Sequence, residues 1–303
     1  MTDAPAGDGA AARHDEDAAR MEQLEPSAVE LVEPGLVRVP QRTATLPPAT
    51  RTNAYLVDTG MGWLVVDPGS ADDAELSIIE QALRDHADGD ALGVFVTHHH
   101  ADHVAGAPAL AARLDVPLWC HREALRRWRG ADGGAPWPPG VHVEELDGDG
   151  WFGEDVRVLS SPGHAPGHLS LLVASGSLVA GDVVAGVGTI VVAPPDGSMT
   201  DYLATLERLA TLTTGAVYPS HGPAALDGAA LLRWYHAHRL ARERRVIDAL
   251  DVEPRSLGEV TAAAYAEVPP ALLPLAQWQC VAHLDRLAEL GIAVERAGRW
   301  ARC

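Results

Sequence analysis

The residues best suited to chemistry form one histidine-rich segment that reads H-x-H-x-D-H. It contains His98, His100, Asp102 and His103, and it directly follows the apolar run Leu92–Val96. Alternate side chains of an extended segment point the same way, so the first two histidines can bind one ion. The last two residues begin a helix and direct a carboxylate and an imidazole toward a neighbouring point. The segment therefore predicts a metal site.

Four further polar residues stand at the ends of other apolar runs. They are Asp67, His164, Asp182 and His221. Loops at the strand ends of a sheet edge can build a site on a rigid base, so we expect these side chains to converge on the histidine-rich segment. Histidine and aspartate suit borderline metals such as zinc, although this donor chemistry also admits iron or manganese.

The elements that must position these residues are short β-branched runs with helices between them. Several runs are continuously apolar, which is typical of strands covered on both faces. Apolar residues recur at helical spacing in 72–86 and 200–213. This order predicts an α/β protein in which sheets lie between helical layers. The predicted strands are Leu36–Val39, Ala54–Val57, Trp63–Val66, Leu92–Val96, Val156–Leu159, Leu169–Val173, Leu178–Val179, Ile190–Val192 and Ala216–Tyr218.

The pattern changes to helix after about residue 228. One long helix extends to Leu250, and a second follows Ser256, with Glu259 at the capping-box position. In a third, apolar residues recur at i, i+3 spacing from Val281 to Leu290 and Gly291 ends the helix, and a hairpin closes at Gly298. Three helices and a hairpin are the components of a winged-helix module. We therefore divide the chain into a disordered acidic tail (1–30), a catalytic domain (31–225) and a winged-helix-like domain (226–303).

Charge and composition limit the partners. The 303 residues carry a net charge of −19, and all 23 basic residues are arginine. Residues 34–225 hold 23 acidic residues and 11 arginines, a net charge of −12. This charge disfavours nucleic acid as a partner. Three cysteines are too few for a disulfide framework, uncharged runs stop short of a membrane span, and the start lacks an apolar signal region. These features predict a cytoplasmic protein with no membrane contact.

Five motifs follow one another along the chain: Asp67, the H-x-H-x-D-H segment, His164, Asp182 and His221. In this order they resemble the metallo-β-lactamase superfamily over residues 35–225. The resemblance implies an αββα sandwich with two zinc ions, although other divalent transition metals are admitted. It also implies that Asp67 supports the ligand loops by hydrogen bonds. Carried over by position, the first ion is bound by His98, His100 and His164, the second by Asp102, His103 and His221, and Asp182 bridges the two.

The C-terminal segment resembles the winged-helix extension of the beta-lactamase-like protein 2 family. The matching residues are Tyr235–Arg239, Arg242–Glu243 and Ala282–Leu284. That family includes an endoribonuclease and fungal thioesterases. The resemblance implies a dinuclear hydrolase that uses a metal-bridging hydroxide, oriented by Asp102 as the catalytic residue.

We expect a small ester or thioester as the substrate, and a homodimer is allowed. An endoribonuclease is the main alternative. A glyoxalase II-like thioesterase is a weaker one, because His221 is followed by Gly-Pro-Ala-Ala and the chain has no lysine. An inactive binding module would have no need of the complete ligand set.

The other histidines and the cysteines are predicted to be structural. His99 should point away from its neighbours by alternation, and His236 and His238 cannot face each other at helical i, i+2 spacing. His168 follows His164 by four residues, and the sequence leaves two roles open for it: support of a ligand, or a structural cap on the next strand. Cys120 is expected in the core.

Overall fold

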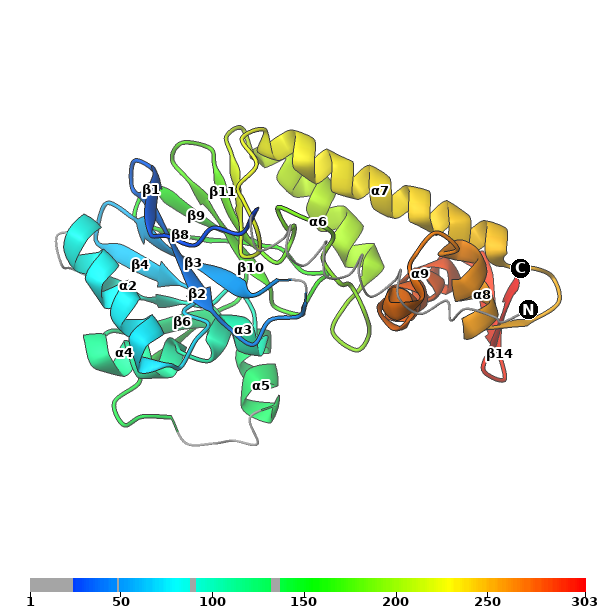
Figure 1. The fold of residues 1–303 in the computed structure, drawn as a ribbon, viewed down its shortest axis with the longest axis horizontal. Coiled ribbons are helices and arrows are strands. Elements are labelled where there is room, and N and C mark those ends of the chain that lie inside the picture. Colours follow the sequence, from blue (N-terminus) through cyan, green and yellow to red (C-terminus); the bar gives the residue numbers. More distant parts are fainter. Residues whose placement is uncertain (1–23, 48, 88–90, 132–136) are drawn as a thin grey trace, which may run out of the picture.

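Two β-sheets stack face to face in the computed structural model, which describes residues 24–47, 49–87, 91–131 and 137–303 (Figure 1). Within these residues the first sheet has seven strands in chain order: β1 Glu30–Glu33, β2 Leu36–Arg42, β3 Arg51–Asp58, β4 Trp63–Val66, β5 Ala91–Phe95, β6 Leu118–His121 and β7 Val143–Leu146. The second has five in the order β12-β11-β10-β9-β8: β8 Gly150–Phe152, β9 Val156–Ser160, β10 Leu169–Val173, β11 Leu178–Gly181 and β12 Val217–Pro219. The predicted α/β class is confirmed.

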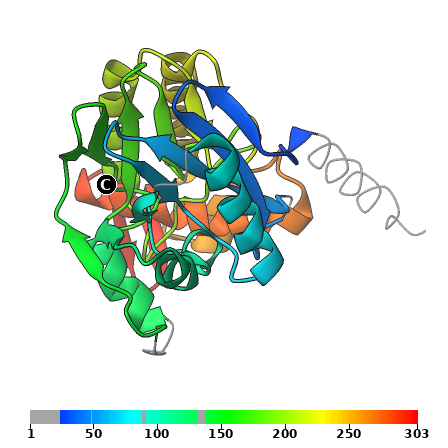
Figure 2. The ribbon, with the colours of Figure 1, turned by 90° about the vertical axis from the view of Figure 1, so that its left-hand side faces the viewer.

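Helices cover the outer face of each sheet. Figure 2 shows α2 in front of the first sheet, and α6 and α7 lie on the second sheet (Figure 1). Helix α2 begins where the Asp72 carboxylate accepts from the Ala74 and Glu75 amides, and α6 begins where the Ser198 hydroxyl accepts from the Asp201 amide. The helices are α2 Asp73–His86, α3 Ala101–Val104, α4 Ala107–Leu114, α5 Arg122–Ala131, α6 Met199–Leu212 and α7 Gly228–Ala249.

Side-chain alternation along the strands of the first sheet divides its apolar residues between two cores. Tyr55 and Val57 on β3 point between the sheets and pack with residues of the second sheet, such as Val158. Leu56, between them, points to the outer core under α2 and α4. Cys120 is buried in that outer core as predicted. Both faces of this sheet are therefore covered at its central strands, which is why β4 and β5 are continuously apolar in sequence.

The C-terminal region has its own core. The elements of this region are β13 Arg255–Ser256, α8 Leu257–Ala264, the 3-10 helix Pro270–Leu272, α9 Leu273–Glu289, β14 Ala293–Arg296 and β15 Arg299–Arg302. The predicted capping box of Ser256 and Glu259 is formed. The third predicted helix is α9, which begins at Leu273 and ends at Glu289, close to the predicted end before Gly291.

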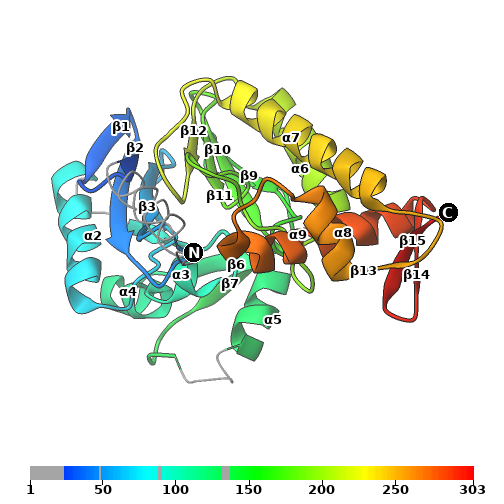
Figure 3. The same ribbon diagram turned by 45° about the vertical axis from the view of Figure 1, so that its right-hand side comes forward.

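Helix α7 belongs to both regions (Figure 3). Its first half contributes Leu232 and Tyr235 to the core between α6 and the second sheet. Its second half contributes Val246 and Ala249 to the C-terminal core. One continuous helix therefore connects the sandwich with the winged-helix-like region.

The predicted strand Ile190–Val192 is wrong, because these residues lie in an irregular segment with no strand partner among the described residues. Their carbonyl groups bond to side chains instead. The Ile190 carbonyl accepts from Arg239, and the Val191 carbonyl accepts from His164. The β-branched composition indicates the burial of Ile190 and Val192 correctly, but it does not reveal that side chains replace the neighbouring strand.

Part of the predicted N-terminal tail is described by the structure. Of the predicted tail 1–30, residues 1–23 lie outside the described residues. Glu25 is described and buried, and its carboxylate accepts hydrogen bonds from the amide and hydroxyl of Thr50 at 2.9 and 2.6 Å.

In the part of the chain that the structure describes, no helix combines the length and apolar character needed to cross a membrane.

Strand direction brings the chemical residues to one edge of the sandwich. β4 and β5 run parallel, as do β11 and β12, so their carboxyl ends lie at a common edge. The residues that follow these strand ends are Asp67 after β4, His98 after β5, His164 after β9, Asp182 after β11 and His221 after β12.

Gly163, next to His164, is required by both its backbone angle and its surroundings. Its φ is +128°, and a Cβ there would lie 2.3 Å from the Tyr202 Cα in α6. We expect Gly163→Ala to lower the free energy of unfolding by about 1–3 kcal/mol through backbone strain. Overpacking should add roughly 1–3 kcal/mol more. Urea denaturation measures both losses together.

Gly148 is the matched control for this test. Its φ is +144°, but a Cβ would meet nothing within 4 Å. Gly148→Ala should therefore show the strain alone. Equal losses in the two variants would contradict the close approach of α6 to the His164 loop.

Candidate metal centre

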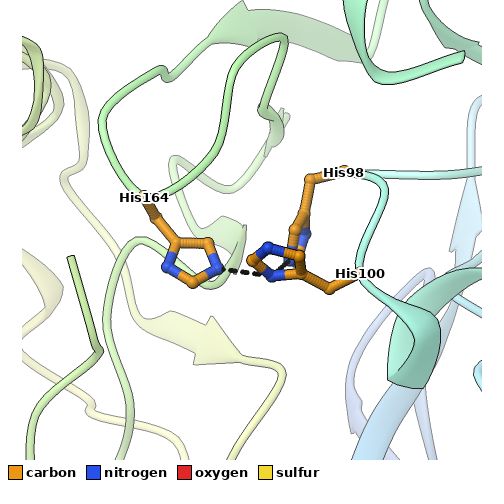
Figure 4. A group of neighbouring side chains, drawn as sticks. All are labelled: His98, His100 and His164. Atoms are coloured by element: carbon orange, nitrogen blue, oxygen red, sulfur yellow. Dashed lines mark hydrogen bonds between the residues drawn. The ribbon is translucent and has the colours of Figure 1, made fainter. Parts of the chain in front are cut away.

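Three histidines form a first cluster (Figure 4). His100 Nδ1 lies 3.0 Å from His98 Nε2 and 3.0 Å from His164 Nε2. Ligand nitrogens of a tetrahedral zinc ion, each at about 2.0 Å, lie about 3.3 Å apart. The three nitrogens therefore have the chemistry and spacing that a divalent ion requires.

Burial keeps the imidazoles of His98 and His164 in the neutral form that binds metals. Burial holds the pKa of His98 well below its ordinary value, and the neighbouring imidazoles of His103 and His100 lower it further. Burial also lowers the pKa of His164 to about 4. Neutral rings present a free lone pair, so these histidines do not need to lose a proton when an ion binds near neutral pH.

The second nitrogen of each ring in this cluster is held by a hydrogen bond. His98 Nδ1 lies 3.0 Å from the Thr97 hydroxyl, and His164 Nδ1 donates to the Val191 carbonyl at 2.8 Å. His100 Nε2 lies 3.4 Å from an Asp196 carboxylate oxygen. Such bonds set the tautomer and the orientation of a ligand ring.

Asp102, His103 and His221 form a second cluster. Asp102 Oδ2 lies 3.5 Å from His221 Nε2 and 3.8 Å from His103 Nε2. The outer nitrogens are again engaged, because His103 Nδ1 donates to Asp67 at 2.8 Å and His221 Nδ1 donates to the Arg51 carbonyl at 3.2 Å. The Nε2 atoms of His103 and His221 therefore both face the Asp102 carboxylate.

Asp182 lies between the two clusters. Its Oδ2 is 3.6 Å from His164 Nε2, and its Oδ1 is 3.3 Å from His221 Nε2 and 3.6 Å from His103 Nε2. Asp182 Oδ1 and His103 Nε2 are buried and have no hydrogen-bond partner. Two buried polar atoms aimed at one point without a partner fit a cation between them.

The electrostatics of the second cluster also favour a cation. Burial opposes ionisation of Asp182, but His221 and His103 outweigh it and hold the pKa of this carboxyl well below its ordinary value. Burial likewise acts to lower the pKa of His103, but the surrounding carboxylates, chiefly Asp102 and Asp182, raise it well above its ordinary value. The site thus attracts a positive charge to the atoms that could bind a metal.

Asp67 supports the site from behind. Its Oδ1 accepts from the Thr97 amide at 2.7 Å, and its Oδ2 accepts from the Thr97 hydroxyl at 2.6 Å and from His103. Asp67 also lies near enough to His98 and His103 to form a three-residue group. Both of its oxygens are already used, so its position agrees with the supporting role that the sequence resemblance implies.

His168 contacts a residue of the site directly. Its Nε2 accepts from the Asp182 amide at 3.1 Å, and its Nδ1 bonds to the Ser161 hydroxyl at 2.8 Å. Gly181 allows this approach, since a Cβ there would lie 2.6 Å from His168 Nε2. Of the two roles left open by the sequence, the geometry favours support of Asp182.

The remaining histidines that the structure describes lie outside both clusters. His99 Nε2 faces Asp196 at 3.1 Å and not the first cluster. His238 stacks on Trp234, and it does not pair with His236 in any metal-binding group of the described residues.

Two supporting residues, Asn53 and Asp196, carry no sequence signal that points to the site. Asn53 on β3 donates to the Pro219 and Gly222 carbonyls at 3.1 and 2.9 Å, and so fixes the loop that carries His221. Asp196 accepts from two histidines and pairs with Arg127 on α5. Asp196 follows two prolines and precedes a glycine, a pattern typical of a turn.

His168→Phe tests the support of Asp182. The ring volume is retained, but the Asp182 amide and the Ser161 hydroxyl lose a buried partner. We expect the free energy of unfolding of the metal-free protein to fall by about 1–3 kcal/mol, measured by urea denaturation. His142→Phe is the control, because this exposed histidine pairs only with Glu144 at the surface. Similar losses in both variants would argue against the buried contact.

Comparison with known proteins agrees with this geometry. The family described as the metallo-beta-lactamase superfamily matches residues 47–221, and the beta-lactamase associated winged helix domain matches residues 256–300. A beta-lactamase domain protein from Burkholderia ambifaria has a similar structure, with a TM-score of 0.77 and 26% identity. The alignment covers 94% of this chain and 99% of that one.

Two curated relatives extend the comparison. The beta-lactamase-like protein 2 homolog of Drosophila melanogaster is 26% identical over 79% of this chain and 83% of its own length. The atrochrysone carboxyl ACP thioesterase of Aspergillus terreus is 29% identical over 73% of this chain and 65% of its own length. Members of the matched family are typically hydrolases and usually bind divalent metals. This chain belongs to the metallo-beta-lactamase superfamily and carries the winged helix domain associated with it.

Proposed function

We propose that the protein is a dinuclear metal-dependent hydrolase, with zinc as the first candidate metal. The observation that carries this proposal is the position of Asp182, whose two carboxylate oxygens face different clusters. A carboxylate placed in this way can bridge two ions. His98, His100 and His164 would hold one ion, and Asp102, His103 and His221 would hold the other.

Two bound divalent ions supply an acidified water molecule and an electrophilic contact for an acyl oxygen. The protein residues prepare the site for this chemistry. Asp102 belongs to the second cluster, and its Oδ2 lies 3.5 Å from His221 Nε2. In this position the carboxylate can also accept a hydrogen bond from the attacking water and orient it. Asp67 and His168 keep His103 and Asp182 in place through the hydrogen bonds described above. The neutral imidazoles of His98 and His164 would leave the positive charge to the metal.

A small ester or thioester is the substrate class that we propose. The negative charge of residues 34–225 disfavours a polyanionic substrate. The thioesterase relative from Aspergillus terreus supports acyl-thioester chemistry on this family scaffold.

The arginines of α7 give further support against a nucleic-acid substrate. Arg239 bonds to the Ile190 carbonyl and to Gln279, inside the protein. Arg242 and Arg245 both pair with Glu267. Arg239 is buried, and Glu267 offsets part of the positive charge of Arg242 and Arg245, so the arginine-rich helix is a weaker phosphate-binding surface than its number of arginines suggests. Endoribonuclease activity remains the alternative that the substrate experiment must exclude.

Metal content tests the first part of the proposal. Protein purified without chelator and loaded with zinc should contain about two equivalents by elemental analysis. Asp182→Asn should weaken both positions by more than about 10-fold, since even outer hydrogen-bond partners are worth about 10- to 100-fold in metal affinity. Asp149→Asn is the control, because Asp149 pairs with Arg208 outside both clusters. Metal-free wild-type protein after loading would refute the proposal.

Salt dependence tests the substrate class. Hydrolysis of a neutral acyl thioester should change little between about 50 and 200 mM salt, because no phosphate contacts are lost. Cleavage of single-stranded RNA that depends on several phosphate contacts should fall steeply over the same range. Both reactions should be followed with the same zinc-loaded preparation. Chelator-sensitive, salt-sensitive RNA cleavage without thioester turnover would favour the nuclease.

A further inference from the structure

One irregular segment, residues 185–197, contacts two of the three histidine rings of the first cluster, those of His100 and His164. We name it the bracing loop. Its Val191 carbonyl accepts from His164 Nδ1 at 2.8 Å. Its Asp196 carboxylate lies 3.4 Å from His100 Nε2. Two of the three imidazoles in the first cluster therefore take their orientation from this loop.

Asp196 is held firmly enough to orient a ring. Its Oδ2 also accepts from His99 Nε2 at 3.1 Å, and its Oδ1 pairs with Arg127 on α5. Arg127 in turn contacts Glu123 at 3.3 Å, one turn earlier on the same helix. These donors keep the pKa of the Asp196 carboxyl well below its ordinary value, chiefly through the hydrogen bonds from His100 and His99.

Helix α7 holds the opposite side of the bracing loop. Arg239 is only 2% exposed. One guanidinium nitrogen donates a hydrogen bond to the Ile190 carbonyl, and another donates to the Gln279 side-chain oxygen on α9. The Tyr235 hydroxyl accepts from the Ala185 amide at 2.9 Å and lies 3.0 Å from the Gly188 carbonyl. The carbonyl bound by Arg239 belongs to the residue immediately before Val191, whose own carbonyl orients His164.

Tight packing does not hold the whole loop. A cleft of about 160 Å³ separates its end, at Pro194 and Gly197, from Asp285, Arg286 and Glu289 on α9. The polar contacts of Asp196, which lies between Pro194 and Gly197, therefore take a larger share in fixing this part of the loop than they would in a closely packed core.

We propose that Asp196 and Arg239 are positioning residues for the first cluster, and that α7 makes the C-terminal region a structural part of the metal centre. The inference rests on the proposed binding of a metal ion by His98, His100 and His164. Arg239 fixes the loop backbone beside Val191, and Asp196 fixes the ring of His100. Neither residue would contact the metal or the substrate.

The test measures metal affinity in the full-length protein, with Zn²⁺ titrated against a chromophoric chelator and Co²⁺ absorption as a second readout. His98→Ala and His221→Ala identify which binding step belongs to which cluster. Asp196→Asn and Arg239→Met should each weaken the first-cluster step by about 10- to 100-fold. The second-cluster step should change by less than about threefold, and the Co²⁺ spectrum of the first cluster should change.

Arg242→Met is the matched control, since Arg242 lies on the same helix but bonds to the Ala264 carbonyl and Glu267. It should leave both steps unchanged. Arg239→Lys should restore part of the affinity, because an ammonium can reach one carbonyl but cannot contact Gln279 at the same time. If Arg239→Met does not fold, Arg239→Lys and Asp196→Asn carry the test.

Native first-cluster affinity in Asp196→Asn and in the Arg239 variants would overturn the inference. Equal losses at both clusters, or an equal effect of Arg242→Met, would also overturn it, because they would indicate general destabilisation. Failure of the wild-type protein to bind Zn²⁺ would instead refute the proposed function.

Discussion

The burial of the Asp182 carboxylate among imidazoles is the interaction on which the rest of the site depends. A buried charge is costly unless it is paired and hydrogen-bonded. Here Asp182 faces His164, His103 and His221, and its backbone amide is held by His168. The surrounding scaffold can be understood as the set of contacts that keeps these groups at fixed positions.

Those contacts come from both sheets. Asp67 at the end of β4 connects the Thr97 backbone with His103, all within the first sheet and its loops. Asn53 on β3 reaches across to the loop after β12 in the second sheet. Because each sheet is covered by apolar packing on both faces, the strand ends are rigid. The loops between them can therefore carry polar groups without losing their geometry.

The sequence predicts the local features well, because strand runs, helix caps and the H-x-H-x-D-H segment have signatures within a few residues. The apolar run Val156–Leu159 and the capping box at Ser256 are examples that the structure confirms. The bracing loop could not be predicted, because the role of the Val191 carbonyl depends on a tertiary contact and has no side-chain signature. Asp196 was missed for the same reason, since its partners His99 and Arg127 are distant in sequence.

Helix α7 also determines how the chain can be divided. Its 22 residues span about 33 Å and give apolar side chains to two separate cores. A protein truncated before this helix would expose the apolar surface of α6, and one truncated within it would lose the C-terminal core. The unit that keeps both of these cores whole is therefore larger than the unit that carries the metal-ligand motifs. Recombinant fragments and chimaeras of this chain should keep α7 intact, together with the region that packs on its second half.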